Sequence, residues 1–319
     1  MKDNFAGTMP TKRFMADLAC GRFDGQGGMS TVAVVATSYH DDAEVIREVA
    51  GYRGISGSVL VSEFDDVSNP QRPTAITEEA AAEIHGFLAS REFENTRFLF
   101  VCDGSVSRSA AMLCAWMRLC GEDDLPLWVD VRDYSPNVLV YGRLLAAGGT
   151  QLSEAQMSER ELLKDVVLSC KVAGRKSHAM HLLEKPWKQI RDGVKRCELR
   201  RLDEKRKAIA PGDLIVFSQV GLPDELLAAH VTECRTAGSV EELLLDEDVL
   251  GASGFATMED AVAGMGEIYG CGPYEALGIF LDASDWVRDA DACRRMPKQI
   301  LDSMRGSAEM RDYFADGMK

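Results

Sequence analysis

Short apolar stretches alternate with amphipathic ones between residues 31 and 120. Three stretches rich in Val, Ala, Leu and Phe have the composition of buried strands: residues 31–38, 58–64 and 97–102. Each is followed by a segment in which apolar positions recur with helical spacing: residues 41–50, 76–90 and 107–120. Strands that alternate with helices predict a parallel sheet with helices on both faces. Two further helices are predicted at residues 137–147 and 153–167.

The pattern changes after about residue 170. Several short strands are separated by turns: residues 180–183, 197–201, 214–219, 230–235 and 276–281. A one-turn helix is predicted at residues 186–192, with Trp187 and Ile190 facing inward and Gly193 as its C-terminal cap. A longer helix is predicted around residues 258–268. This arrangement predicts a small α+β unit built as a compact β-barrel.

These patterns divide the chain into five parts. Residues 1–30 lack periodicity and end in the run Gly25-Gln26-Gly27-Gly28, so we predict a flexible N-terminal segment. An α/β domain follows at residues 31–150, and a helical connector at 151–170. The small β-barrel domain occupies residues 171–283. A charged, helical C-terminal tail is predicted at 284–319.

Composition narrows the class of protein. The chain has 319 residues, 46% of them hydrophobic and 27% charged, which excludes a disordered or fibrous protein. Its nine cysteines include no C-x-x-C pair, which favours a reducing, cytoplasmic location and no structural zinc. No apolar run approaches the ~18 residues that span a bilayer, so no membrane partner is expected. His178 and His181 lack a third ligand at metal spacing, and we expect neither metal nor cofactor.

The negative charge is unevenly distributed. The chain carries a net charge of −15, whereas residues 171–210 contain 13 Lys or Arg and 5 Asp or Glu. A basic block in an acidic protein favours focused, salt-dependent binding of a polyanion. The alternative is a solvated basic face without a partner.

The segment between Cys102 and Ser109 follows a predicted strand and opens a predicted helix. Its loop residues are Asp103, Gly104, Ser105, Val106 and Ser107. Such a loop directs backbone N–H groups at an anion, and the helix N-terminus with Arg108 stabilises a thiolate at Cys102. Arg108 can bind two phosphate oxygens, and Ser109 can hydrogen-bond the thiolate. These residues suit attack on a phosphoryl group through a phosphocysteine.

Residues 31–147 resemble the dual-specificity and tyrosine phosphatase family, through the motif at 106–111 and the upstream segment at 64–67. The resemblance implies that Asp66, with Asp65 second, is the general acid that protonates the leaving oxygen. The family usually has His where this chain has Val101, and Gly where it has Ser105. If the loop requires positive φ there, Ser105 costs about 1 kcal/mol. The alternative is a degenerate fold that binds phosphate without chemistry.

A second set of polar residues lies between positions 193 and 217. Glu198 and Arg200, two residues apart on a strand, share a face and predict a buried or half-buried ion pair in a polar pocket. The basic residues expected to rim this pocket and contact phosphates are Lys195, Arg196, Lys205 and Arg206.

Residues 177–283 closely resemble the ASCH domain, a relative of the PUA fold, through G-x-K-x-x-E-x-R at 193–200, D-E-K-R at 203–206 and G-D-x-I-x-F at 212–217. The resemblance implies a barrel that binds RNA, a nucleotide or a modified nucleoside. Some members hydrolyse acylated cytidine with a Lys, a Thr three residues later and a distant Glu. Lys195 matches the first, but Glu198 stands in place of the Thr.

The sequence as a whole predicts a two-domain protein. Its ASCH domain would bind RNA or a nucleotide, and its phosphatase-like domain would hydrolyse a phosphomonoester on a protein or a nucleic-acid end through Cys102. The alternative is a non-catalytic module that binds RNA and phosphate.

Overall fold

The computed structural model describes residues 5–23, 30–91, 96–130, 134–270 and 272–283. Contacts divide the chain into two units, residues 1–164 and 165–319, each described below by itself. The predicted C-terminal tail at 284–319 lies outside the described residues. No described helix has both the length and the apolar composition needed to cross a bilayer.

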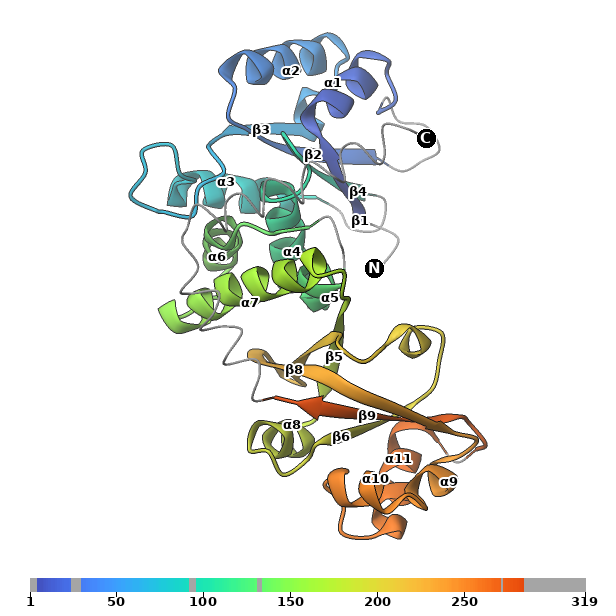
Figure 1. Ribbon diagram of the computed structural model, residues 1–319. Coiled ribbons are helices and arrows are strands. Elements are labelled where there is room, and N and C mark those ends of the chain that lie inside the picture. The colour runs from blue at the N-terminus through green and yellow to red at the C-terminus, as the bar shows by residue number, and fades with distance from the viewer. Residues whose placement is uncertain (1–4, 24–29, 92–95, 131–133, 271, 284–319) are drawn as a thin grey trace. The chain divides into compact units, whose positions relative to one another are not determined.

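The N-terminal unit is built on a four-stranded parallel sheet (Figure 1). Its strands are β1 (Phe5–Pro10), β2 (Ser30–Thr37), β3 (Val59–Glu63) and β4 (Thr96–Cys102). The strand order is β1-β4-β2-β3, and every pair is parallel. The predicted parallel sheet is therefore confirmed. Because all strands run the same way, their C-terminal ends meet at one edge, where open α/β sheets bind ligands.

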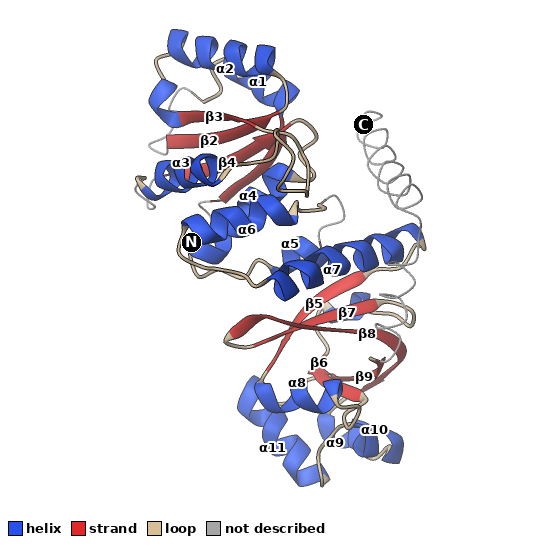
Figure 2. Cartoon of the chain, turned by 90° about the vertical axis from the view of Figure 1, so that its left-hand side faces the viewer, coloured by secondary structure: helices blue, strands red, loops and turns tan. Residues whose placement is uncertain are grey.

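Helices cover both faces of this sheet (Figure 2). Helices α1 (Thr11–Ala19) and α2 (His40–Tyr52) lie on one face, and α3 (Glu78–Ala89), α4 (Arg108–Leu119) and α6 (Val138–Ala147) lie on the other. A 3-10 turn (Ser56–Ser58) precedes β3, and the short helix α5 (Leu125–Val129) follows α4. Val35 and Val101 pack against the α1–α2 side, whereas Phe98 contacts Trp116 of α4 with ring centroids 5.3 Å apart. Both faces are buried, which accounts for the continuous apolar strands.

The prediction of a flexible segment at residues 1–30 is wrong for its described part. Residues 5–10 form β1, which pairs with β4, and residues 11–19 form α1. Phe14 and Leu18 of α1 are each 1% exposed, and the Phe14 ring stacks on Phe23 at 5.2 Å. The sequence concealed this strand because it is short and interrupted by Gly7. Its pairing with β4 stabilises it.

Helix α7 (Glu154–Val172) is the predicted connector, and the division between the two units falls within it. Its first half carries Arg160, which is 1% exposed inside the N-terminal unit. The Arg160 guanidinium lies over the Trp128 and Tyr141 rings, at 5.1 and 5.5 Å, and 4.0 Å from Asp124. The aromatic faces and the carboxylate offset the desolvation of this cation.

The C-terminal unit contains a five-stranded mixed sheet in the order β5-β7-β8-β9-β6. Its strands are β5 (Ser177–Leu182), β6 (Cys197–Arg201), β7 (Leu214–Gln219), β8 (Leu222–Ala237) and β9 (Ala276–Asp282). Its helices are α8 (Glu184–Arg191), a 3-10 turn (Arg206–Ala208), α9 (Val240–Leu244), α10 (Glu247–Ala252) and α11 (Met258–Tyr269). Strand β8 is longer than predicted because residues 222–229 pair with β7 in a hairpin.

Where the sequence predicted a compact barrel, the structure has a curled, mixed sheet whose two edge strands do not pair. Strands β5 and β6 are its two edges and do not pair with each other. Side chains connect these edges instead: Arg200 Nη2 donates to the His181 carbonyl at 2.8 Å, and Lys205 Nζ donates to the Ala179 carbonyl at 3.3 Å. The edge strand β5 therefore has carbonyl groups bound by two cations: Arg200, which the sequence placed in an ion pair with Glu198, and Lys205, which it placed on the rim of the pocket.

Helix α8 agrees with the sequence prediction. Trp187 and Ile190 are 5% and 1% exposed and belong to the core of this unit. Gly193 has a φ of 74°, and its N–H donates to the Ile190 carbonyl at 3.0 Å. This is the left-handed conformation that favours glycine after a helix.

The packing of α1 on the sheet can be tested by substitution, because a flexible N-terminal segment would not bury the Phe14 ring. Phe14→Ala removes a fully buried ring, so we expect the free energy of unfolding of the N-terminal unit to fall by about 3–5 kcal/mol. Urea denaturation of the full chain measures it. Lys12→Ala on the exposed face of the same helix is the control and should change little. Equal, small effects of the two variants would mean that α1 does not pack on the sheet.

Candidate functional site

The loop between β4 and α4 lies at the C-terminal edge of the parallel sheet. Cys102 is the last residue of β4, in register with Pro10 of β1 and Ala36 of β2. The helix α4 begins at Arg108. The Cys102 thiol donates to Ser109 Oγ at 3.1 Å, which is the contact expected from the sequence. Cys102 is only 2% exposed, so a ligand reaches its sulfur only if a neighbouring group moves.

Ser105 adopts the left-handed conformation anticipated for this position. Its φ is 59°, and it is the one non-glycine residue with positive φ among those that the structure describes. Such a conformation costs a residue with a Cβ about 1 kcal/mol. The Ser105 hydroxyl donates to Thr8 Oγ1 at 2.7 Å, and Thr8 Oγ1 lies 2.9 Å from Tyr134 Oη. These hydrogen bonds hold the strained turn against the end of β1.

Arg108 is buried, with 3% of its surface exposed, and most of its donors are engaged. Nη1 donates to Ser38 Oγ at 3.1 Å and to the Phe64 carbonyl at 2.5 Å. Nη2 donates to Asp103 Oδ2 at 2.5 Å. Its Nε is buried and has no hydrogen-bond partner within the described part of the chain. The guanidinium is therefore held at the loop by three of its five N–H groups, and the Nε–H is one of the two that remain.

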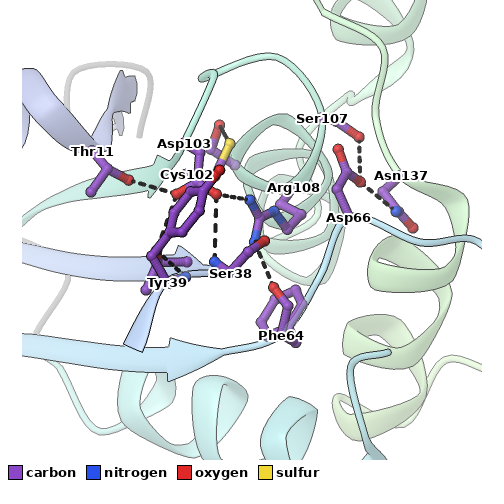
Figure 3. A network of polar contacts seen from close by, with 12 residues as sticks. Thr11, Ser38, Tyr39, Phe64, Asp66, Cys102, Asp103, Ser107, Arg108 and Asn137 are labelled. Atoms are coloured by element: carbon purple, nitrogen blue, oxygen red, sulfur yellow. Dashed lines mark hydrogen bonds and ion pairs between the residues drawn. The ribbon is translucent and has the colours of Figure 1, made fainter. Parts of the chain in front are cut away.

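Asp103, which follows Cys102 in the chain, accepts hydrogen bonds from several segments (Figure 3). Oδ1 accepts from Thr37 Oγ1 at 3.1 Å and from Thr11 Oγ1 at 3.4 Å. Oδ2 accepts from Arg108 Nη2 and from the Ser38 backbone N–H at 3.4 Å. The sequence analysis placed Asp103 in the loop but missed Thr11, Thr37 and Ser38. Their only sequence signal is their position at the ends of strands.

The two candidate general acids lie in different surroundings. Asp66 is exposed, and its Oδ1 accepts from Ser107 Oγ at 2.9 Å and from Asn137 Nδ2 at 2.7 Å. Hydrogen bonds from Thr74 and Ser38 lower the pKa of Asp65, with a further contribution from the Arg108 charge. A lowered pKa disfavours the protonated form that a general acid needs. Asp66 is therefore the better placed of the two.

Asn137 is a residue that the sequence analysis passed over. It is 2% exposed and caps α6, because its Oδ1 accepts from the Val140 N–H at 3.1 Å. Its amide nitrogen is thereby directed at Asp66. The available signal was an asparagine as the first residue of the helix predicted at 137–147, since asparagine favours the N-terminal cap.

The second site is centred on a buried carboxylate in the C-terminal unit. Glu198 Oε2 lies 3.0 Å from Lys195 Nζ, and Oε1 lies 2.9 Å from Arg200 Nε. Lys195 and Glu198 are each 5% exposed. The predicted ion pair is confirmed. The prediction that Lys195 rims the pocket is wrong, because its ammonium is drawn inward by Glu198 and lies 5.5 Å from the Phe255 ring centroid.

The electrostatics of this group follow from its burial. Burial raises the pKa of the Glu198 carboxyl, but the charges of Lys195 and Arg200 and their hydrogen bonds outweigh it and leave this pKa below its usual value. Arg200 is also held by the His181 carbonyl and by Tyr269 Oη, at 2.8 and 3.4 Å. Glu198 therefore remains ionised at neutral pH and fixes Arg200 against β5.

The basic block 171–210 is less uniform than its sequence indicates. Each of its five acids forms an ion pair with at least one cation of the block, and Arg206 pairs in this way with Asp203. Five exposed cations form no ion pair with any described residue: Arg175, Lys176, Lys185, Arg196 and Arg201. Lys205 is exposed as well and reaches β5. The cations available to a ligand are therefore mostly not those of the motif.

The two histidines discounted as metal ligands have other partners. His178 Nε2 lies 2.9 Å from Asp213 Oδ2, and His181 Nδ1 lies 2.7 Å from Ser218 Oγ.

The burial of Glu198 generates a stability prediction. Glu198→Gln leaves two cations uncompensated, so the free energy of unfolding of the C-terminal unit should fall by about 3–5 kcal/mol at pH 7. The folded-state pKa of Glu198 is below the reference 4.5, so its contribution is present above pH 4.5 and is lost as the pH falls below it. Urea denaturation should therefore show the gap between wild type and variant narrowing below pH 4.5. Glu184→Gln, in an exposed pair with Lys188, is the control and should have a much smaller effect. A difference in the free energy of unfolding that does not change with pH would contradict an ionised Glu198 paired with Lys195 and Arg200.

Comparison with known proteins gives a family match within the C-terminal unit. Residues 180–269 match the family model described as ASCH domain. Among solved structures, the chain is similar to the crystal structure of hypothetical protein PH0355, with 27% identity and a TM-score of 0.29 over 33% of this chain and 97% of that one. It is also similar to the solution NMR structure of protein PF0455 from Pyrococcus furiosus, with 25% identity and a TM-score of 0.27 over 33% of this chain and 96% of that one. No curated protein matches the chain. The protein therefore carries an ASCH domain at residues 180–269.

Proposed function

We propose that the ASCH domain binds RNA or a nucleotide at the surface beside strands β5 and β6. The resemblance to ASCH proteins supports this, since the family is associated with RNA. The arrangement of cations around the buried Glu198 carries the proposal, because Glu198 fixes Arg200 against β5 while Lys205 reaches the same edge. Arg201, next along β6, is exposed and forms no ion pair with described residues.

In the proposed binding surface, buried residues position the backbone and more exposed residues contact the RNA. Lys195, Glu198 and Arg200 are largely buried, so their role is to position the strand and the turn that follows it. Lys205 and Arg206 lie in that turn and supply charge to phosphates; Arg206 remains paired with Asp203. Neutralised phosphates release counterions, which makes such binding strongly dependent on salt.

Binding of single-stranded RNA tests this proposal. In the double variant Lys205→Ala and Arg206→Ala, affinity should fall about tenfold or more. The slope of log affinity against log salt should fall by about 1.4, or 0.7 for each lost phosphate contact. Fluorescence anisotropy between 50 and 200 mM salt measures both quantities.

The matched control is the double variant Lys12→Ala and Arg13→Ala, which removes the same charge from the exposed face of α1. It should keep both the affinity and the slope. Equal losses in the two double variants would attribute binding to net charge alone and refute a defined surface on the ASCH domain.

We propose in addition that the loop at Cys102–Arg108 binds a phosphoryl group, and that Cys102 cleaves a phosphomonoester. The observation that favours this is Arg108, a buried guanidinium at the C-terminal edge of the sheet with an unpartnered Nε. An unmet buried N–H costs about 1–3 kcal/mol, and a phosphate oxygen can accept from it.

The proposed reaction has two steps. The Cys102 thiolate attacks phosphorus, the bond from phosphorus to the ester oxygen breaks, and the departing oxygen takes a proton from Asp66. Water then gives a proton to the Asp66 carboxylate and attacks the phosphorus of the phosphocysteine. The bond from sulfur to phosphorus breaks, which releases inorganic phosphate and the thiolate, and Ser109 stabilises the thiolate by a hydrogen bond. Asp66 is held near the loop because its Oδ1 accepts hydrogen bonds from Ser107 Oγ and Asn137 Nδ2.

Hydrolysis of an aryl phosphate tests the chemistry. Cys102→Ser should abolish turnover, because serine is a far weaker nucleophile at neutral pH, whereas Cys20→Ser at an exposed position should leave it unchanged. Release of the aryl alcohol is followed by absorbance. Phosphate binding without turnover in the wild type would instead favour the non-catalytic module.

A further inference from the structure

The carboxylate of Asp103 occupies a site with the donors of an anion-binding pocket. Its two oxygens accept from the Thr11 and Thr37 hydroxyls, the Ser38 backbone N–H and the Arg108 guanidinium, at 2.5 to 3.4 Å. These donors come from separate segments, namely the start of α1, the end of β2 and the start of α4. They converge because the ends of β1, β4 and β2 are adjacent in the sheet.

The occupant of this site is unusual in two respects. Asp103 directly follows Cys102, so its charge lies beside the group that would attack phosphorus. It also takes the Nη2 donor of Arg108, the buried cation of the loop. Nη1 donates to Ser38 and to the Phe64 carbonyl, which leaves Nε and the second hydrogen of Nη2.

We propose that Asp103 is an internal anion that fills the loop's own phosphate site, and that it determines which ligands the loop accepts. This inference rests on the proposed phosphoryl-binding function of the loop. A small dianion such as inorganic phosphate meets the Asp103 charge and finds Arg108 already neutralised. Inorganic phosphate therefore binds weakly, because its negative charge is repelled by the Asp103 carboxylate.

A larger phosphorylated ligand differs in one physical respect. Contacts made by the rest of the ligand supply free energy that offsets the displacement of Asp103 from its donors. The Asp103 side chain is 26% exposed, compared with 4% for that of Arg108, so it is the partner with room to leave. The loop therefore selects phosphoryl groups on larger molecules over free phosphate.

The test is calorimetric titration of the full chain with inorganic phosphate at pH 7. Asp103→Asn keeps the size of the side chain and an oxygen for the threonine hydroxyls but removes the charge. We expect it to bind phosphate about tenfold or more tightly than the wild type. Asp103→Ala, which also vacates the site, should bind at least as tightly. Glu48→Gln, an equal charge change on the exposed face of α2, should match the wild type.

The outcomes separate the two proposals. Tighter binding by either folded Asp103 variant, with Glu48→Gln unchanged, supports the internal anion. Measurable wild-type binding that neither Asp103 variant improves overturns this inference and leaves phosphoryl binding by the loop intact. Absence of phosphate binding in the wild type and in both variants, with thermal unfolding confirming that each is folded, overturns the loop's proposed function together with the inference.

Discussion

A carboxylate held against a buried cation organises the polar centre of each unit. Asp103 faces Arg108 at the edge of the parallel sheet, and Glu198 lies between Lys195 and Arg200 in the ASCH domain. Removing a cation from water costs several kcal/mol unless an opposite charge and hydrogen bonds replace the lost solvation. The partners are therefore bound to each other before any ligand arrives, and they fix the surrounding loops and strands.

The two carboxylates differ in how firmly they are held. The Glu198 side chain is 6% exposed and has a cation on each oxygen, so it acts as permanent scaffold for β6. The Asp103 side chain is 26% exposed. Its hydrogen-bond donors lie at the C-terminal edge of the parallel sheet, which is where such sheets bind ligands. The same chemical pairing thus supports two roles: a fixed frame around which exposed cations are arranged, and an occupant that a stronger anion can replace.

Much of the frame could be predicted from sequence. The apolar stretches that became β2, β4 and β7 are buried along their lengths, and burial on both faces produces a continuous hydrophobic signal. Strand β1 was not predicted because it contains Gly7 and ends at Pro10, which weaken the strand pattern. Pairing with β4 stabilises it in the folded protein. The expected barrel became an open, curled sheet because side chains rather than a strand pair connect its edges.

Sequence spacing determined part of the local geometry of both sites. The entry of the Cys102 loop into a helix and the shared face of Glu198 and Arg200 depend on neighbours along the chain. A positive φ at Ser105 was raised only by the resemblance to phosphatases, which have glycine there. Only the tertiary structure decided which charges are free. Thr11 and Thr37 reach Asp103 across 92 and 66 residues of chain, and Lys195 turns inward instead of facing solvent. Such contacts depend on strand order and burial. Both bring together residues that are far apart in the sequence, so the sequence pattern does not predict that they meet.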